Sequence, residues 1–373
     1  MTSPIYESAD NNSITTMNKI IAGKTEVYFC ENCSHLQTNE LPDLVEYYAR
    51  EYEINTANEE IDQLYKVVDG KVIYRADHQA AILQSKVEFA PGIRVLDYGC
   101  AKSPTLRKVI KAHPEVRPFL FDVTDRYIPS WESFPQKAEW ATHTPDPSWH
   151  GTMDIVLSFY ALEHVADLQQ GLANIKALLK TGGTFYFLVP NAYSNIADFV
   201  VADHVNHFSR GSLLRLLEKH GFGNVEVDAE SHEAAFVVKA TLLTDPKSVF
   251  SPIESFDELR SAALDIAGYW HQIATRIREF EETVGASQVA VYGAGFYGNF
   301  IASTLIHSDN IACFVDRNQH LQETNMNGKP ILAPEQMPRN VTHVFVGLNP
   351  RTARSNIEAI DCWRDRQLSY FFL

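Results

Sequence analysis

Short apolar runs alternate with helix-like stretches through the middle of the chain, from about residue 78 to 240. The runs at 94–97, 118–122, 154–159 and 184–189 have the length of buried strands, and polar or small residues follow each of them. Alternation of strands with helices is typical of a mostly parallel sheet. After a predicted helix at 210–220, the runs at 224–228 and 235–240 lie close enough in sequence to pair antiparallel. We therefore predict an α/β fold.

A different pattern, with apolar residues stepping by four and three, begins near residue 255 and predicts one long helix. Ser255 and Glu258 have the spacing of a capping box, and Gly285 can end the helix. The apolar positions are Leu259, Ala263, Ile266, Trp270, Ile273, Ile277 and Phe280. Such a seam packs against a neighbour. The simpler interpretation is a helix that bridges two domains, and a homodimer helix is the alternative.

These patterns divide the 373 residues into four parts, as expected for a chain that is long for one domain. Residues 1–77 are a polar, tyrosine-rich N-terminal lobe, and 78–245 are the alternating α/β domain. Residues 246–285 are a linker and the long helix. Residues 286–373 begin with a strand at 288–292 and a glycine loop, followed by a strand at 311–315. This last part predicts a second, smaller Rossmann-like domain.

Composition changes the picture mainly by exclusion. A net charge of −15 argues against nucleic acid as a partner, because its phosphates would be repelled. No apolar run is long enough to cross a bilayer, and the first residues lack the basic and apolar regions of a secretory signal. The 5 cysteines are scattered and do not make a disulfide framework. We expect a cytoplasmic protein without a membrane partner that acts on a small molecule.

Candidate chemistry is concentrated at residues 95–103, where a strand ends in Asp97 and small residues lead into a helix. Gly99 and its small neighbours let a ligand approach the backbone, and the helix supplies free N–H groups. Asp122 closes the next strand, where a carboxylate can accept hydrogen bonds from ribose hydroxyls. The loop lacks the three-glycine dinucleotide pattern, so a cofactor without phosphates fits better. The alternative is that both aspartates only cap strands and bind loop amides.

Three motifs in this domain resemble those of class I S-adenosylmethionine-dependent methyltransferases. Residues 95–100 resemble the first motif of that family, 158–165 the segment after its fourth strand, and 178–183 the turn before its fifth. The resemblance implies S-adenosylmethionine as the cofactor and a Rossmann-like sheet of the class I methyltransferase type. The donor-binding residues it implies are Asp97, Gly99, Ala101, Asp122 at the ribose, Thr142 near the adenine, and Tyr160 near the methionine end or the acceptor. Ala101 and Ser103 stand where the family usually has glycine.

Methyl transfer from a sulfonium needs an aligned acceptor that usually loses a proton, and a histidine suits the role of base. Two candidate places are Glu163-His164, just past the fourth predicted strand, and the segment 203–209, which contains His204 and His207. A carboxylate next to a histidine can raise its basicity or bind a sugar hydroxyl itself. The second segment resembles an acid–histidine signature of sugar methyltransferases that modify deoxysugars and surface polysaccharides. This narrower resemblance implies His204 as base, Asp203 as its acidic neighbour and His164 as an assisting histidine. Val201 and Asp203 depart from the signature, which puts C-methylation in doubt and leaves O-methylation open.

The same resemblance suggests that His207 and Tyr52 contact the acceptor. Structural alternatives exist for the histidines. His204 could be an exposed loop residue bonded to backbone, His207 could pack or cap the next helix, and His164 could serve either purpose. His78 would approach the pocket only if the N-terminal segment folds over it.

Cys30 and Cys33 have zinc-ligand spacing, but a closed structural site needs four ligands. His35 is a candidate third ligand, and no fourth is evident. Related sugar methyltransferases carry a second cysteine pair in an N-terminal zinc lobe, and this chain lacks an upstream pair. We expect a degenerate lobe with buried thiols rather than a zinc site.

Gly293, Gly295 and Gly298, with Asp316 at the end of the next strand, match the dinucleotide fingerprint. Spacing alone leaves NAD binding open. The related enzymes carry such a domain as part of the acceptor cleft without redox use, so NAD is not expected. Asn318, Asn349 and Arg351 are then predicted contacts to a nucleotide diphosphate or sugar.

The sequence as a whole predicts S-adenosylmethionine-dependent methyl transfer to a nucleotide-linked sugar, in surface polysaccharide or deoxysugar biosynthesis. Two rival hypotheses remain. One is an NAD-dependent nucleotide-sugar oxidoreductase that uses the Gly293 loop. The other is a non-catalytic sugar-nucleotide-binding protein with a relict pocket.

Overall fold

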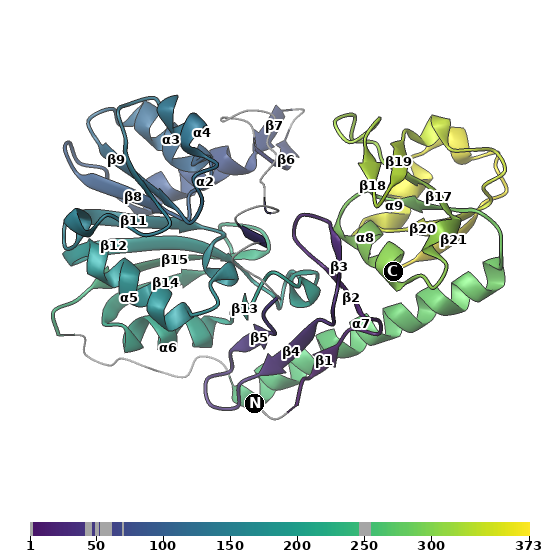
Figure 1. The fold of residues 1–373 in the computed structure, drawn as a ribbon, viewed down its shortest axis with the longest axis horizontal. Helices are drawn as coiled ribbons and strands as arrows, with labels where there is room; N and C mark the ends of the chain where they lie inside the picture. Colours follow the sequence, from purple (N-terminus) through teal and green to yellow (C-terminus); the bar gives the residue numbers. More distant parts are fainter. Residues whose placement is uncertain (1–2, 42–46, 49–51, 53–61, 69–70, 246–254) are drawn as a thin grey trace.

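The computed structural model describes residues 3–41, 47–48, 52, 62–68, 71–245 and 255–373. A seven-stranded sheet and a six-stranded sheet form two α/β domains, with a small N-terminal sheet and a long helix beside them (Figure 1). The predicted linker at 246–254 lies outside the described residues. No helix within the described ranges has the length and apolar character needed to cross a membrane.

The larger sheet has the strand order β10-β9-β8-β11-β12-β15-β14. Its strands are β8 (Arg94–Tyr98), β9 (Arg117–Asp122), β10 (Glu139–Thr142), β11 (Met153–Phe159), β12 (Leu179–Pro190), β14 (Phe222–Asp228) and β15 (Ala235–Leu242). Strands β8 to β12 pair parallel, whereas β15 runs antiparallel to both β12 and β14. The four predicted parallel strands and the antiparallel pair are thus confirmed. Strand β10 was not predicted, because this edge strand is short and its residues are half-buried or exposed.

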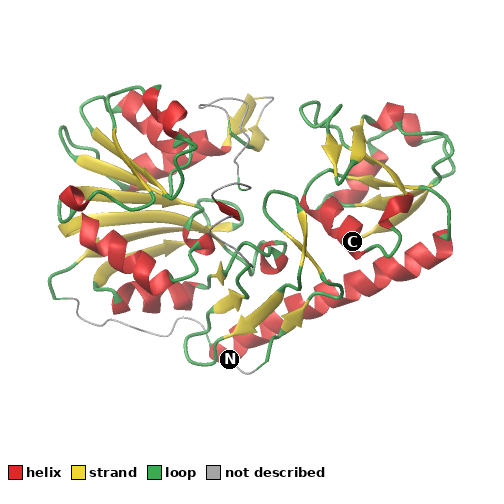
Figure 2. Cartoon of the chain, in the orientation of Figure 1, coloured by secondary structure: helices red, strands yellow, loops and turns green. Residues whose placement is uncertain are grey.

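Helices cover both faces of this sheet, which explains why its strands read as nearly continuous apolar runs. They are α2 (Arg75–Lys86), α3 (Pro104–Ala112), α4 (Ile128–Glu132), α5 (Leu168–Leu178) and α6 (Arg210–Lys219). Because side chains alternate along a strand, Phe185 and Phe187 of β12 enter one core, and Tyr186 and Leu188 enter the other. Figure 2 shows the helices on either side of the strands.

The long helix α7 (Phe256–Val284) has the predicted ends. The Ser255 side chain accepts a hydrogen bond from the Glu258 N–H at 3.5 Å, and Gly285 follows the last turn with φ of 62°. Its apolar seam is buried within this chain, against the N-terminal strands, a loop of the first domain and the second domain. The seam of the helix therefore packs against other parts of its own chain.

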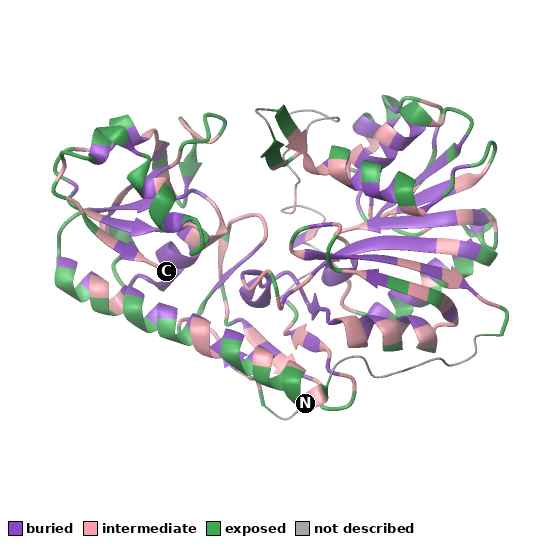
Figure 3. Cartoon of the chain, turned by 180° about the vertical axis from the view of Figure 1, so that it is seen from behind, coloured by how far each residue is buried: buried purple, intermediate pink, exposed green. Residues whose placement is uncertain are grey.

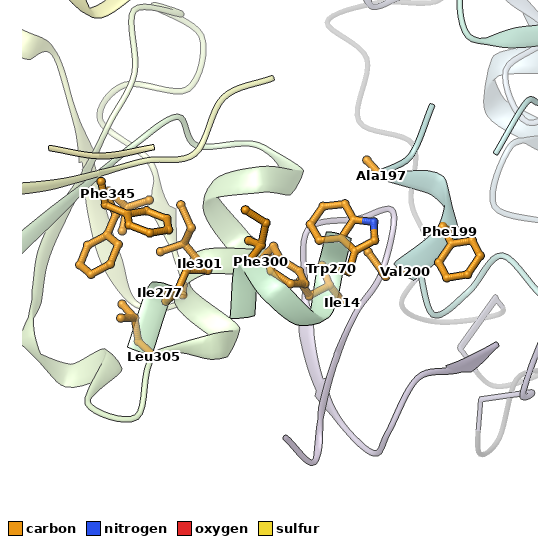
Figure 4. Packing of buried hydrophobic residues seen from close by; sticks show 14 of the residues in the cluster. Ile14, Ala197, Phe199, Val200, Trp270, Ile277, Phe300, Ile301, Leu305 and Phe345 are labelled. Carbon is orange, nitrogen blue, oxygen red and sulfur yellow. The ribbon is translucent and has the colours of Figure 1, made fainter. Parts of the chain in front are cut away.

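Trp270 lies at the centre of that seam (Figure 4). The indole is fully buried, donates a hydrogen bond from Nε1 to the Ile196 carbonyl at 2.9 Å, and packs on Phe300 with ring centroids 4.5 Å apart. Trp270 thus links a loop of the first domain to helix α8 (Phe296–Thr304) of the second.

The second domain is a smaller sheet with the order β18-β19-β17-β16-β20-β21. Its elements are β16 (Val289–Tyr292), α8 (Phe296–Thr304), β17 (Ile311–Val315), β18 (Asn325–Met326), β19 (Lys329–Leu332), β20 (His343–Val346), α9 (Ala353–Glu358) and β21 (Ser369–Phe372). Its strands pair parallel except for β18, as in a Rossmann-like unit. Figure 3 shows that the strands of both α/β domains are largely buried.

The N-terminal lobe is less separate than predicted. Its main sheet contains β1 (Tyr6–Glu7), β4 (Glu26–Phe29) and β5 (Leu36–Thr38), and its fourth strand is β13 (Asn206–His207) from the first α/β domain. The expected boundary after residue 77 also falls inside α2, which begins at Arg75. The pairing of β13 with β5 joins the lobe to the first α/β domain.

Two hairpins complete the N-terminal part. The hairpin of β2 (Asn12–Ile14) and β3 (Ile20–Ala22) packs against α8. The hairpin of β6 (Leu64–Val68) and β7 (Lys71–Tyr74) leads directly into α2. The N-terminal segment therefore touches both α/β domains.

Candidate active site

The loop after β8 adopts the shape that glycines usually provide, although two of its residues are not glycine. Gly99, Ala101 and Ser103 all have positive φ, of 71°, 44° and 53°. The left-handed conformation costs non-glycine residues roughly 1–2 kcal/mol each. Trp131 of α4 offsets part of this cost by donating a hydrogen bond from Nε1 to the Ala101 carbonyl at 2.7 Å. Ala101 and Ser103 thus adopt the left-handed conformation at positions where the resemblance implies glycine.

Asp97 and Asp122 lie at the carboxyl ends of the neighbouring strands β8 and β9. One oxygen of Asp97 accepts a hydrogen bond from Ser103 Oγ at 2.5 Å, and the other has no partner among the described residues. Asp122 accepts hydrogen bonds from the Ala101 N–H at 2.8 Å and the Thr124 N–H at 3.3 Å. Burial raises the pKa of Asp97 to about 7 and that of Asp122 to about 6. Asp122 thus binds loop amides, as the alternative of a strand-capping aspartate predicts. Each of its oxygens still has a lone pair for a ligand.

Thr142 and Tyr160 lie on either side of these carboxylates. Thr142 ends β10 directly opposite Asp122 in the parallel ladder. Tyr160 follows β11 with φ of 53°, and the guanidinium of Arg75 stands 5.2 Å from its ring centroid. The predicted donor residues thus converge on one edge of the sheet.

The N-terminal segment folds over this edge of the sheet, so His78 can approach the pocket. The ring of Tyr65 in β6 stacks on His78 with centroids 4.1 Å apart, and His78 lies 5.4 Å from the His232 ring. The Tyr160 hydroxyl lies 3.4 Å from His232 Nδ1. These aromatic and imidazole rings lie beside Tyr160.

Asp198, rather than Asp203, is the acidic partner of His204. The 3-10 helix η4 (Asp198–Val200) presents Asp198, whose Oδ1 lies 2.5 Å from His204 Nδ1 and whose Oδ2 lies 2.8 Å from His207 Nδ1. Burial alone would lower the pKa of His204, but the charge and hydrogen bond of Asp198 outweigh burial and raise it to about 9. His204 is thus a buried, oriented imidazole rather than an exposed loop residue.

Asp203 is turned towards the N-terminal lobe instead. It is fully buried and accepts hydrogen bonds from the Thr16 N–H at 2.7 Å, Thr16 Oγ1 at 2.5 Å and the Tyr47 hydroxyl at 3.2 Å. Asp203 was predicted to orient His204 or the acceptor. The first of these roles belongs to Asp198, which holds His204 Nδ1. Asp203 and His204 are adjacent in sequence, yet their side chains are held by different partners.

His207 has no free ring nitrogen for a substrate. Its Nδ1 faces Asp198, its Nε2 lies 2.7 Å from Thr38 Oγ1, and its side chain is 0% exposed. The predicted contact with the acceptor is corrected, and the packing alternative is right. His207 instead joins the N-terminal sheet to Asp198.

His164 lies in η3 (Leu162–His164), just after β11, with its ring centroid 4.7 Å from that of His204. His164 Nδ1 lies 2.8 Å from the Asp203 carbonyl and 2.8 Å from the Tyr48 hydroxyl. A carbonyl only accepts, so Nδ1 carries the hydrogen and Nε2 has the lone pair. Burial lowers the pKa of His164 to about 4, which keeps the ring neutral. The ring centroids of Tyr52 and His164 are 5.4 Å apart, so Tyr52 lies beside the acid–histidine cluster of Glu163, His164, Asp198 and His204.

Glu163 completes the cluster and was not among the predicted catalytic residues. It is 0% exposed, and neither carboxylate oxygen has a hydrogen-bond partner among the described residues. Burial raises the pKa of Glu163 to about 8. One ligand atom each from Glu163, His164 and His204 lie within 4.8 Å of one another. Glu163 and Asp198 each stand inside an apolar stretch of the sequence. A buried charge without a partner is costly, so such a position could have indicated a functional acid.

The cysteine motif does not gather further ligands. Cys30 and Cys33 are half-buried free thiols. His35, the candidate third ligand, lies with its Nε2 3.0 Å from Asn206 Oδ1, and burial lowers its pKa to about 4. In the part of the chain that the structure describes, neither cysteine belongs to a group that could hold a metal ion.

Two of the three glycines in the loop of the second domain, Gly293 and Gly298, pack closely against backbone. A Cβ on Gly298 would lie 1.9 Å from the Gly293 carbonyl oxygen, whereas Gly295 faces open space. Asp316 accepts a hydrogen bond from the Ala294 N–H at 2.8 Å. The Asn349 side-chain oxygen accepts from the Arg351 N–H at 3.0 Å, so this part of Asn349 serves the local turn. Burial raises the pKa of Tyr297, and the charge of Arg351 opposes that shift.

The loop that carries Asp198 belongs to the junction between the domains. Ala197, Phe199 and Val200 share one apolar cluster with Trp270 and Phe300 (Figure 4). The beginning of α8, just after the Gly293 loop, packs against the same cluster. The acid–histidine cluster therefore lies between the donor loop and the second domain.

Together these features define a Rossmann-like domain that binds a nucleoside-type cofactor at its carboxyl edge, beside a buried acid–histidine cluster. Residues 74–227 match a family model described as a methyltransferase domain. This range spans α2, the strands β8 to β12 and the residues of the cluster. The chain thus carries a class I methyltransferase domain, and it is an enzyme whose methyl donor is S-adenosylmethionine.

Comparison with curated proteins gives no match. Among solved structures, the S-adenosylmethionine-dependent methyltransferase of Aquifex aeolicus is 16% identical, with TM-score 0.38, over 44% of this chain and 89% of that one. The Mesorhizobium loti enzyme is 16% identical, with TM-score 0.36, over 44% and 97%. A chain of the Haloferax volcanii complex with the Trm112 methyltransferase activator is 17% identical, with TM-score 0.40, over 45% and 91%.

Proposed function

We propose that this enzyme transfers the methyl group of S-adenosylmethionine to a nucleotide-linked sugar, in surface polysaccharide or deoxysugar biosynthesis. The observation that supports this most is the His204–Asp198 pair, with Nδ1 and Oδ1 2.5 Å apart. The pair lies beside the segment that follows β11, next to the donor loop. A buried carboxylate that orients an imidazole leaves Nε2 as the proton acceptor.

The proposed reaction is an in-line displacement at the methyl carbon. An oxygen or carbon atom of the acceptor forms the new bond to the methyl group, and the bond to the sulfonium sulfur breaks. S-adenosylhomocysteine leaves, and the acceptor proton passes to Nε2 of His204 in its neutral form. Because Asp198 raises the pKa of His204 to about 9, methyl transfer should accelerate as the pH rises towards 9. Asp198 then stabilises the imidazolium that forms, since opposite charges at close range favour the charged form. His164 borders the same space with its Nε2 lone pair.

The second domain supports a nucleotide-linked acceptor. Gly295 leaves open space at the start of α8, and Tyr297 is close enough to Arg351 for the arginine charge to act on the phenol. A guanidinium suits a diphosphate group. The junction around Trp270 connects this end of the second domain to the loop that carries Asp198. We therefore place the nucleotide near Arg351 and the sugar near His204.

Replacing Asp122 by alanine is expected to weaken S-adenosylmethionine binding by about tenfold or more. A hydrogen bond to a charged group contributes about 1.5–3 kcal/mol, and 1.4 kcal/mol is a factor of ten. Isothermal titration calorimetry of the full chain measures the change. Asp125→Ala, at an exposed position nearby, is the matched control. Unchanged donor affinity in Asp122→Ala would refute the proposed role at the ribose.

The proposed function predicts that the full chain binds S-adenosylmethionine and that NAD gives no comparable signal in calorimetry. With a radiolabelled methyl donor, label should pass to nucleotide-linked sugars in preference to the free sugars. Tight NAD binding without S-adenosylmethionine binding would favour the oxidoreductase hypothesis. Donor binding without transfer to any sugar would favour a relict binding protein.

A further inference from the structure

Glu163, His164 and His204 form a convergent set of ligand atoms. One atom from each residue lies within 4.8 Å of the other two. Glu163 and His164 come from η3, whereas His204 comes from the segment before β13. The set is the one group of histidine, cysteine and acidic residues within the described ranges that could hold a metal ion.

Both imidazoles are oriented as metal ligands are. Each uses Nδ1 for a hydrogen bond, His204 with the Asp198 carboxylate at 2.5 Å and His164 with the Asp203 carbonyl at 2.8 Å. Metal-binding histidines almost always donate their other ring N–H to a carboxylate or a backbone carbonyl, which fixes the tautomer. Nε2 of each ring is then the atom free for a ligand.

Glu163 supplies the independent observation. Its side chain is 0% exposed, and both carboxylate oxygens lack a hydrogen-bond partner among the described residues. Buried carboxylates are normally paired or bound to a metal, because an unpaired buried charge is costly. The neighbouring donors are already engaged, since the Tyr48 hydroxyl lies between His164 Nδ1 and the Asp203 carbonyl. Among the described residues, an unpartnered buried carboxylate and two imidazoles thus converge, which favours a cation over a lone hydroxyl.

We propose that Glu163, His164 and His204 bind one divalent transition-metal ion through a carboxylate oxygen and two Nε2 atoms. Two imidazoles and one carboxylate are the ligand set of catalytic zinc and non-haem iron sites, which keep coordination positions open. An acceptor hydroxyl in such a position would lose its proton more readily. His204 Nε2 holds either the ion or the acceptor proton, so the metal-bound enzyme activates the acceptor through the ion and the metal-free enzyme through the imidazole.

Zinc titration tests the site without reference to any acceptor. We titrate the full chain carrying Cys30→Ser and Cys33→Ser with Zn²⁺ in a calorimeter. The two changes remove the cysteine pair that has zinc-ligand spacing. We expect saturation at one ion per chain. Adding Glu163→Gln should weaken Zn²⁺ binding by at least about tenfold. Loss of a group that only orients a metal ligand already costs that much, and Glu163 would be a ligand itself. Glu282→Gln, at an exposed glutamate of α7, is the matched control and should leave the affinity unchanged.

Thermal melting provides a second readout that does not depend on activity. Zn²⁺ should raise the melting temperature of the Cys30→Ser, Cys33→Ser chain, since a ligand stabilises the folded state that binds it, and should not raise that of the Glu163→Gln chain. Glutamine has nearly the same shape as glutamate, so the metal-free Glu163→Gln chain should melt cooperatively. Absence of saturable Zn²⁺ binding, or equal affinity with Glu163→Gln, would overturn the proposal.

Failure of this inference is distinguishable from failure of the proposed function. Sugar methylation that persists unchanged with a chelator, in a chain that binds no Zn²⁺, would overturn the metal site and leave the proposed function standing. Zn²⁺ binding that depends on Glu163 in a chain that methylates no sugar would support the metal site and remove the proposed function.

Discussion

Replacing His204 by alanine is expected to abolish most methyl transfer while S-adenosylmethionine still binds with its original affinity. Positioned acid–base catalysis contributes about 10²–10⁴-fold to a rate, so turnover should fall within that range. His204 is held by Asp198, whereas Asp97 and Asp122 are held by Ser103, Ala101 and Thr124. Single-turnover transfer from labelled donor measures the first effect, and calorimetry measures the second.

Two variants make this result interpretable. Asp198→Asn keeps the shape of the buried partner and removes its charge, so it should lower turnover in the same direction. His150→Ala, at an exposed histidine, should leave both transfer and donor binding unchanged. If His204→Ala turned over at the original rate, His204 would have no part in the mechanism.

Trp270→Ala is expected to lower the free energy of unfolding by about 3–5 kcal/mol, the usual loss for a fully buried large aromatic residue. Trp270 fills the junction of α7, α8 and the loop at 196–200, and its Nε1 hydrogen bond to the Ile196 carbonyl at 2.9 Å would also be lost. The loop carries Asp198, so we also expect kcat/KM for the sugar acceptor to fall while donor affinity persists. Denaturant unfolding and steady-state kinetics measure the two effects.

Trp270→Phe separates the packing from the hydrogen bond. Phenylalanine keeps most of the buried volume but has no N–H, so the loss should be nearer the roughly 1 kcal/mol of a single hydrogen bond. A loss with Trp270→Ala no larger than that of Trp270→Phe would show that the junction does not depend on this side chain. Unaltered acceptor kinetics in a stable Trp270→Ala protein would separate the junction from catalysis.

The elements that could be predicted are those whose residues are buried by their immediate neighbours in the sequence. Strands β8, β9, β11 and β12 have helices on both faces, so they appear as apolar runs, and α7 carries its own start and end signals at Ser255 and Gly285. The N-terminal strands and β18 to β21 were not predicted. Most of these strands are four residues or fewer in length, and they depend on pairing with segments far away in the chain.

The candidate site divides in the same way. Asp97, Gly99 and Asp122 could be found from sequence because strand ends and a tight loop are local features. Asp203 was assigned to His204 because the two are adjacent, but the turn at 202–203 lets their side chains meet different partners. The actual partner, Asp198, is separated from His204 by six positions. The position of Glu163 in an apolar stretch was visible in the sequence, but its lack of a hydrogen-bond partner among the described residues depends on the packing of several distant segments.

The sequence by itself determined the class of fold, the donor loop with its carboxylates, the bridging helix and the presence of histidines after β11 and before α6. Only the tertiary structure decided which acid orients which histidine, that His207 is structural, and that the N-terminal lobe is joined to the first domain through β13. The physical reason is the range of the interactions. Thr16 and Asp203, 187 positions apart, are hydrogen-bonded, and Tyr48 meets His164 across 116 positions. Such pairings depend on the packing of whole elements, which no local pattern of residues specifies.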